Sequence, residues 1–392
     1  MGRPSGSARL SCFSQPGRLL HFAGFDMISP PNVGGNEFIM GKRIAFCADG
    51  TWDSATKHTN VYKLYKALTT TAEQIPLYDD GVGADGNPII RILGGAFGTG
   101  LWAKIKEGYT KIAHVYEQGD EVFLFGFSRG AYTARSLAGM IAACGLPTKN
   151  FTNDLVEDAF DAYRDKDNRQ EKLKKLANCD MFGADITMVG VWDTVGSLGI
   201  PSAIGAIDPV AYGFLDTSLN PKIKNAYQAL AMDERRAQFP PTLWKGDPNP
   251  GQIVEQVWFT GAHSDVGGGE PDDLPGTTEL SDITLGWMIG KASSIGLQFD
   301  QDVQKLYTCP LDPEYAQATF HESWKVFCGV PIRRTIDKNA SIANSVQLRC
   351  EHDSAWRPQN LSFQNGVLAP GYQIVSVVRP LAPGAGAAAS QP

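Results

Sequence analysis

Apolar runs of strand length alternate along the chain with segments whose apolar residues recur at helical spacing. The runs that predict a strand followed by a loop are "RIAFCAD" (43–49), "IPLYDDGVG" (75–83), "EVFLFGF" (121–127), "ITMVGVWDTVGS" (186–197) and "EQVWFTGAHSDVGGG" (255–269). The helical patterns lie at 60–68, 100–119 and 129–145. Because the strands are apolar on both faces, they predict an α/β fold with a mostly parallel central sheet and helices on both faces.

The two ends of the chain lack this alternation. Residues 1–40 are rich in Gly, Pro and Ser, which predicts a disordered extension, and residues 383–392 predict a disordered low-complexity tail. A single domain is expected over residues 41–382. The charged segment 163–180 predicts a helix, which is either part of a cap or insertion near 150–185 or a solvated surface helix.

Composition and charge narrow the class of protein. The net charge of −7 argues against general nucleic-acid binding, because phosphate contact needs a basic face. No apolar run approaches the roughly 18 residues of a membrane-spanning helix, so any membrane contact would be peripheral. The N-terminus lacks the apolar core of a signal peptide, and the seven scattered cysteines suit reduced thiols. We expect a cytoplasmic protein, with export by a signal-peptide-independent secretion system left open.

Ser128 lies at the centre of Gly126-Phe127-Ser128-Arg129-Gly130, a G-x-S-x-G pattern. The pattern alone is weak, but here it follows a predicted strand and precedes a predicted helix, as a nucleophile elbow does. Such a turn exposes the hydroxyl, and its glycines avoid a collision across the turn. The start of the helix then points its amides at the place where negative charge develops in acyl transfer. Ser128 is therefore the predicted nucleophile, against the alternative of a Gly-Ser turn without chemistry.

A serine nucleophile needs a base, and the base needs an acid that orients it. Of the six histidines, His263 is the main candidate because it lies in a small-residue loop after an apolar strand. Asp193 and Asp265 also follow strands, and either is a candidate acid. The order Ser128, Asp193, His263 is that of the α/β-hydrolases. Asp265, two residues after His263, would hold either the ring or the loop.

The oxyanion donors are expected from the backbone. One is the N–H of Arg129, directly after the nucleophile, and the other is that of Gly50 or Thr51 in the loop "DGTWD". The side chains assigned to the substrate pocket are Asp49, Trp52, Phe127 and Trp192. Asp49 invites a metal site, but no second carboxylate lies at ligand spacing. Neither a metal ion nor an organic cofactor is therefore expected.

Several long segments, in order, resemble the catalytic α/β-hydrolase domain of type VI secretion phospholipase effectors and their uncharacterised bacterial and fungal relatives. They include "CADGTWD", "YDDGVG", "GFSRGAYTARSLAGMI", "VGVWDTVGS", "AYQALAMDERRAQFPPTLW" and "VWFTGAHSDVGGG". The resemblance covers about residues 42–365 and implies an α/β-hydrolase fold and a hydrolase of the lipase or esterase type. It matches Ser128 to the family's nucleophile and places Asp193, His263 and Asp265 in its other signature loops.

The chain departs from this family in two respects. It shows none of the extra membrane-targeting segments of the toxins, so the resemblance supports a hydrolase more strongly than a secreted phospholipase. In addition, Ala343 stands where relatives often have a histidine, in an Ile-His-x-Ser-Val-like stretch. The base is then His263, or a late histidine such as His352, or the enzyme is impaired.

Taken together, these patterns predict a serine hydrolase that cleaves an acyl ester of a lipid-like small molecule through a Ser-His-Asp triad and an acyl-enzyme. Two alternatives keep the same fold: a catalytically impaired binding module and an antibacterial lipase effector. A weaker third alternative is a phosphoryl-transfer enzyme built on Asp49 and the glycine-rich loops.

Overall fold

The computed structural model describes residues 41–50, 58–81, 97–148, 151–165, 167–195, 219–270, 278–307, 310–325 and 328–379. The chain divides into two compact units, and all of these residues belong to the second, Met40–Pro392. The extension predicted at 1–40, the loop residues 51–57 and the predicted tail at 383–392 lie outside the described residues.

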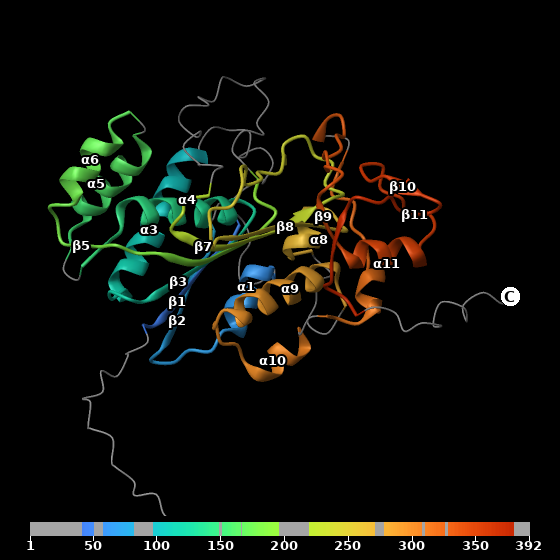
Figure 1. The fold of residues 1–392 in the computed structure, drawn as a ribbon, viewed down its shortest axis with the longest axis horizontal. Coiled ribbons are helices and arrows are strands. Elements are labelled where there is room, and N and C mark those ends of the chain that lie inside the picture. Colours follow the sequence, from blue (N-terminus) through green and yellow to red (C-terminus); the bar gives the residue numbers. More distant parts are fainter. Residues whose placement is uncertain are drawn as a thin grey trace, which may run out of the picture. The chain divides into compact units, whose positions relative to one another are not determined.

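An eight-stranded sheet forms the centre of the second unit (Figure 1). Its strands are β1 (Arg43–Ala48), β2 (Gln74–Asp79), β3 (Glu121–Phe127), β6 (Ile186–Trp192), β7 (Ile223–Ala231), β8 (Ile253–Phe259), β9 (Ser341–Ala343) and β12 (Gln373–Val375). They lie in the order β12-β9-β8-β7-β6-β3-β1-β2, and each neighbouring pair is parallel. The prediction of a mostly parallel sheet is confirmed, and the fold is α/β-hydrolase-like.

Both faces of the sheet are buried, which explains why its strands read as continuous apolar runs. In β1, Ile44 and Phe46 belong to one hydrophobic cluster, whereas Ala45 and Cys47 belong to another. Successive side chains of a strand point to opposite faces, so these clusters lie on the two sides of the sheet. A strand covered on both sides has no polar face to show in its sequence.

Helices cover the two faces as predicted. The first face carries α3 (Phe97–Val115), α4 (Arg129–Cys144) and α5 (Asn153–Arg164), whose apolar side chains join the cluster of Ile44. The second carries α1 (Asn60–Ala67), α8 (His263–Gly267), α9 (Leu280–Ser294) and α11 (Asn344–His352). Figure 1 shows α3 and α4 on one side of the sheet and α1 and α9 on the other. Among the described residues, no helix is both long and apolar enough to cross a membrane.

The remaining elements are short and lie around this core. They are α6 (Arg169–Leu176), α10 (Gln301–Leu306), the 3₁₀ helix η3 (Pro313–Gln317), and the strands β4 (Leu146–Pro147), β5 (Met181–Phe182), β10 (Phe363–Gln364) and β11 (Val367–Leu368). β4 pairs with β5 and β10 pairs with β11, each antiparallel and each outside the central sheet.

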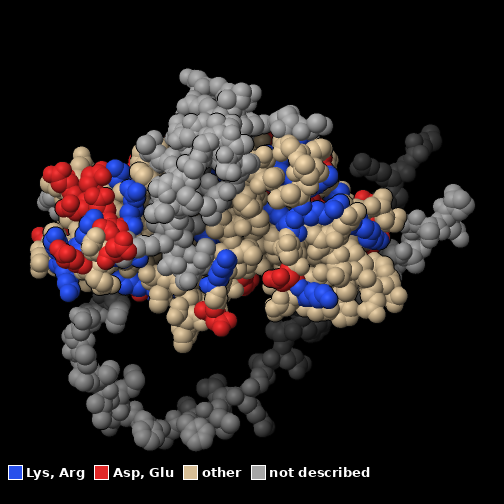
Figure 2. All heavy atoms as spheres, turned by 90° about the horizontal axis from the view of Figure 1, so that it is seen from above, with Lys and Arg blue, Asp and Glu red and all other residues tan. Residues whose placement is uncertain are grey.

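The charged segment at 163–180 is divided between two helices. It begins in the last residues of α5 and continues as α6, because Asp165 accepts hydrogen bonds from the backbone and side chain of Asn168 and turns the chain. α6 packs against α5, and α5 packs against α4. Figure 2 shows acidic and basic side chains gathered over this end of the unit. A role for the segment as a cap remains a prediction.

The order of the strands reverses at β1, which has β2 on one side and β3 on the other. In open α/β sheets the loops at the carboxyl ends of two such strands leave the sheet in opposite directions and open a crevice for ligands. Asp49 follows β1 and Ser128 follows β3. The topology therefore places both residues at the edge of the sheet where a ligand is expected.

Two glycines allow the chain to pass from β3 into α4. A Cβ atom on Gly126 would lie 2.3 Å from the carbonyl oxygen of Gly130, across the turn. A Cβ atom on Gly130 would lie 2.1 Å from the carbonyl oxygen of Ala48, at the end of β1. Gly130 is thus required by contact with the neighbouring strand as well as by the turn itself.

We expect Gly130→Ala to lower the free energy of unfolding by about 3 kcal/mol, near the upper end of overpacking costs, because the new methyl group meets rigid backbone. Urea unfolding followed by circular dichroism measures the change. Gly183→Ala is the matched control, because a Cβ atom there meets no atom within 4 Å. A Gly130→Ala protein as stable as the wild type would contradict the close approach of α4 to β1.

Candidate active site

Ser128 occupies the turn between β3 and α4 in a strained backbone conformation. Its φ is 57° and its ψ is −117°, in the region of positive φ that is uncommon for residues other than glycine. Its N–H donates a hydrogen bond of 3.1 Å to the carbonyl oxygen of Trp192 at the end of β6. The turn is therefore anchored to the adjacent strand, and strain of this kind gathers at functional sites.

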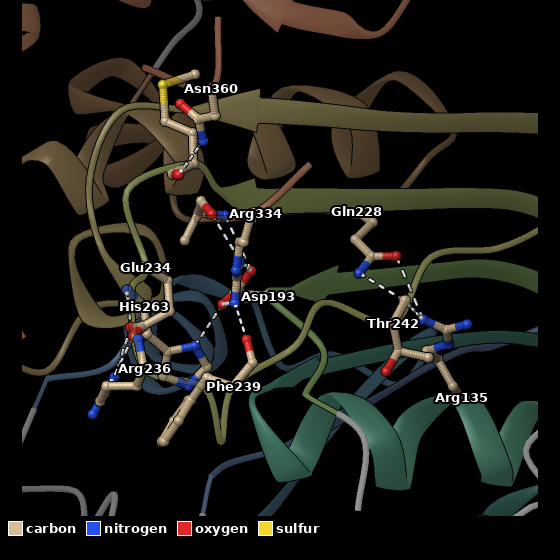
Figure 3. Close-up of polar contacts among 12 residues, drawn as sticks. Arg135, Asp193, Gln228, Glu234, Arg236, Phe239, Thr242, His263, Arg334 and Asn360 are labelled. Atoms are coloured by element: carbon tan, nitrogen blue, oxygen red, sulfur yellow. Dashed lines mark hydrogen bonds and ion pairs between the residues drawn. The ribbon is translucent and has the colours of Figure 1, made fainter. Parts of the chain in front are cut away.

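Asp193 follows β6 directly and is completely buried, with a φ of 37°. Its Oδ1 accepts a hydrogen bond of 3.0 Å from the N–H of Ala231 at the end of β7. Its Oδ2 lies 2.6 Å from Nδ1 of His263 (Figure 3). Both oxygens also accept hydrogen bonds from the guanidinium of Arg334, at 2.5 and 2.9 Å.

These contacts decide the charge of Asp193. Burial alone would raise the pKa of this carboxyl group, but the charges and hydrogen bonds of Arg334 and His263 hold the pKa well below its ordinary value. Asp193 is therefore a carboxylate at neutral pH, and its four contacts use both oxygens fully.

His263 is the first residue of α8 and is also buried. Its ring packs against those of Phe127 and Phe239, with centroid distances of 4.6 and 5.0 Å. Its backbone N–H donates to Oε2 of Glu234 at 3.2 Å. Burial lowers the pKa of His263 against the opposing effect of Asp193, so the imidazole is neutral at pH 7. With Nδ1 bound to Asp193, the ring is held in one orientation.

The second ring nitrogen of His263, Nε2, is the atom that could act as a base. Within the described part of the chain, Nε2 is buried and has no hydrogen-bond partner. When the proton is on Nδ1, shared with Asp193, Nε2 carries the lone pair that a general base needs. The structure thus joins Asp193 to His263 directly.

Two contacts place this pair beside the Ser128 turn. Phe127, which immediately precedes Ser128, stacks against the ring of His263. Gly267 of α8 also lies against Phe127, and a Cβ atom at Gly267 would lie 2.0 Å from the phenyl ring. The absence of a side chain at Gly267 lets α8 approach the end of β3 and brings His263 next to the turn.

A buried asparagine holds α8 in place from behind. The side-chain nitrogen of Asn60, in α1, lies 2.8–3.0 Å from three acceptors, which are the carbonyl oxygens of Val266 and Ser281 and Oγ1 of Thr284, and its two N–H groups are shared among them. The indole N–H of Trp192 donates to the same hydroxyl at 3.1 Å. Asn60 and Thr284 therefore form a buried hydrogen-bond network that links α1, α8, α9 and the end of β6.

Among the described residues, the hydrogen-bond partners of Asp265 are Ala262 and His321 and not the ring of His263. Oδ2 of Asp265 accepts a hydrogen bond of 2.9 Å from the N–H of Ala262, and its Oδ1 lies 2.6 Å from Nδ1 of His321. Burial raises the pKa of Asp265 to about 6. Of the two roles that the sequence left open, these contacts are those of a residue that holds the loop.

The late histidine is placed differently. His352 is exposed at the end of α11, and Ala343 is buried at the end of β9. Neither belongs to the buried group formed by Asp193 and His263.

The predicted oxyanion donors have different surroundings. Arg129 is the first residue of α4, at the end where backbone N–H groups have no acceptor within the helix. The N–H of Gly50 donates to Oδ1 of Asp49 at 2.8 Å, so in this structure that amide is directed at its neighbour. Thr51, the other candidate, and Trp52 of the predicted pocket lie outside the described residues.

The other residues assigned to the pocket are Asp49, Phe127 and Trp192, and all three are buried. Asp49 accepts hydrogen bonds of 2.7 Å from the hydroxyls of Thr59 and Tyr78, and burial raises its pKa to about 6. Phe127 and Trp192 are almost fully buried. Among the described residues, no group of three or more His, Cys, Asp or Glu side chains is arranged to hold a metal ion.

Three charged residues at this site were not predicted from the sequence. Glu234 is buried and pairs with Arg236 at 2.8 Å, and the guanidinium of Arg236 lies 3.8 Å from the ring centroid of Phe239. Both charges lie in "DERRAQFPPTLW", a segment whose aromatic and proline residues suggest the rim of a site. Nothing in the sequence indicated a role for Arg334, because it lies 141 residues from Asp193 in a segment without a regular pattern of apolar residues.

Comparisons with known proteins cover part of the chain. The uncharacterized protein YEL023C of Saccharomyces cerevisiae is 30% identical over 228 residues, which are 51% of this chain and 32% of that protein. An uncharacterized protein from Pseudomonas aeruginosa has a similar structure, with a TM-score of 0.41 and 16% identity, over 68% of this chain and 49% of that one. The chain therefore spans about a third of the yeast relative and about half of this solved chain.

A second solved structure is the Tle1 effector bound to the VgrG spike from the type 6 secretion system. Its TM-score is 0.34 and its identity is 18%, over 60% of this chain and 52% of that one. The model of one family, described as T6SS phospholipase effector Tle1-like, catalytic domain, matches residues 42–291. That range is more than half of the 392 residues and contains Ser128, Asp193 and His263 but not Arg334. The chain belongs to the family of Tle1-like catalytic domains of type VI secretion phospholipase effectors.

Proposed function

We propose that this chain is a serine hydrolase of the lipase or phospholipase type, which cleaves an acyl ester of a lipid-like substrate. The observation that carries the proposal is the hydrogen bond of 2.6 Å between His263 and Asp193, buried beside the strained turn of Ser128. Membership of a phospholipase effector family supports the same chemistry. Location in the cytoplasm and delivery to another cell both remain predictions for this chain.

In the proposed mechanism, Oγ of Ser128 attacks the carbonyl carbon of the ester while Nε2 of His263 takes the hydroxyl proton. Asp193 holds the Nδ1–H and stabilises the imidazolium that forms. Backbone amides at the start of α4, beginning with Arg129, stabilise the oxyanion. The leaving alcohol then receives the proton from His263, and the acyl group remains on Ser128. Water, deprotonated by His263, attacks this acyl-enzyme and releases the acid.

The apolar surroundings of the base suit a lipid-like substrate. Phe127 and Phe239 both pack against the imidazole, and the guanidinium of Arg236 stacks on the ring of Phe239. Aromatic side chains of this kind exclude water and provide apolar contact for an acyl chain. We expect a substrate drawn from a lipid surface to bring the chain into peripheral contact with that surface.

We expect Ser128→Ala and His263→Ala each to lower kcat for p-nitrophenyl esters by about 10³-fold or more, because each removes a group that bonds or transfers a proton in the reaction. Hydrolysis of esters of graded chain length measures the loss. His352→Ala is the matched control, since that side chain is exposed on α11, and it should keep wild-type activity.

Loss of activity in His352→Ala but not in His263→Ala would make the late histidine the base. A wild-type protein that neither turns over these esters nor reacts with a fluorophosphonate probe would refute the hydrolase. The chain would then be a binding relative with the same fold.

The pH dependence of kcat/KM should follow the neutral form of His263. Since burial holds the pKa of His263 below its ordinary value of about 6.5, the base stays neutral into mildly acidic solution. We therefore expect a plateau at neutral pH and a tenfold loss per unit once the pH falls through that pKa. A soluble short-chain ester measures the profile, and an acid inflection above pH 7 would contradict the assignment.

A further inference from the structure

Arg334 is buried against the candidate acid although it belongs to no helix or strand. Its side chain is 2% exposed, in the irregular segment that precedes β9. Nη1 donates to Oδ1 of Asp193 at 2.5 Å and Nη2 donates to Oδ2 at 2.9 Å, so that the fork of the guanidinium matches both carboxylate oxygens. This bidentate geometry is the strongest form of an ion pair between the two residue types.

Two backbone carbonyls fix the guanidinium in this position (Figure 3). Nη1 of Arg334 also donates to the carbonyl oxygen of Ala231 at 2.7 Å, and Nη2 donates to that of Phe239 at 2.7 Å. Ala231 ends β7, and Phe239 contacts the ring of His263. Arg334 therefore links the carboxylate of Asp193 to the backbone at Ala231 and Phe239.

The guanidinium of Arg334 also shares the Asp193 oxygen that His263 contacts. Oδ2 of Asp193 interacts with Nδ1 of His263 and with Nη2 of Arg334 at once. The other charged groups that act on His263 are Glu234, whose carboxylate accepts its backbone N–H, and Arg236, which pairs with Glu234. Arg236 lowers the pKa of His263 and Glu234 raises it, so these two act in opposite directions. Arg334 contacts the carboxylate of Asp193 and not the imidazole, so any effect on His263 passes through Asp193.

We propose that Arg334 is a positioning residue of the catalytic site, which fixes the carboxylate of Asp193 and weakens its hold on the imidazolium of His263. This role rests on the proposed function. It lets Asp193 orient the base without trapping its proton, which must pass on to the leaving alcohol. The alternative is a purely structural role, in which the buried ion pair contributes to stability and leaves the pKa of His263 unchanged.

Titration of His263 separates these roles without relying on turnover. In Arg334→Gln, the cation is lost while a hydrogen-bonding side chain remains, so we expect the pKa of His263 to rise by about one unit. Nuclear magnetic resonance of labelled imidazoles measures it, and His263→Gln identifies the signal. The acid inflection of kcat/KM should move upward by the same amount. An unchanged titration of His263 in folded Arg334→Gln would overturn the proposal.

Arg349→Gln is the matched control. Arg349 is a buried arginine as well, but its Nη1 donates to the carbonyl oxygens of Ala316 and Ala318. Its loss should lower stability and leave the titration of His263 unchanged. If both variants shift the titration equally, the shift reflects loosening of the fold, and the proposal fails.

Arg334→Lys separates charge from geometry and serves if Arg334→Gln does not fold. Lysine keeps the cation but cannot form the fork, so we expect the titration of His263 to stay near wild type and kcat to fall about tenfold. A wild-type kcat in Arg334→Lys would overturn the positioning role.

A double-mutant cycle tests whether Arg334 acts through Asp193. In the Asp193→Asn background, Arg334→Lys should cost little further kcat/KM, whereas independent effects would multiply. Absence of any turnover that depends on Ser128 would refute the proposed function, and the titration would still decide the proposal for Arg334.

Discussion

The burial of one charge, that of Asp193, is the constraint on which the rest of the site depends. A carboxylate removed from water must find partners, and this one takes them from the backbone of Ala231, the ring of His263 and the guanidinium of Arg334. These partners come from the end of β7, from α8 and from the segment before β9. Asp193 can therefore stay charged in the core only when these three parts of the chain lie next to one another.

Much of the fold and part of the site could be predicted from the sequence. The strands were recognisable because a parallel sheet covered on both faces leaves continuous apolar runs. Ser128, Asp193 and His263 each follow such a run, and the carboxyl ends of parallel strands meet at one edge of the sheet. Topology thus places all three residues along one edge of the sheet, and the close approach of α8 at Gly267 then brings His263 next to the Ser128 turn.

What could not be predicted depends on direction and on distant contact. The sequence places Asp265 near His263, but only the course of α8 decides that its carboxylate meets His321. It likewise places Gly50 at a strand end without fixing where the amide points, and that amide donates to Asp49. Arg334 could not be predicted, because it belongs to no repeating pattern of apolar residues. Its contact with Asp193 forms only when the folded chain brings these distant residues together.

The order of the strands has a consequence for synthesis on the ribosome. Once β1 has paired with β2 and β3, the strands β6, β7, β8, β9 and β12 add in turn to the same growing edge. The nascent chain can therefore extend its sheet in the order in which it is made, without inserting a strand between two that have already paired. The cation of Arg334 arrives late, after Asp193 and His263 have been translated. Asp193 therefore gains the counter-charge of Arg334 only after the chain has been made as far as residue 334.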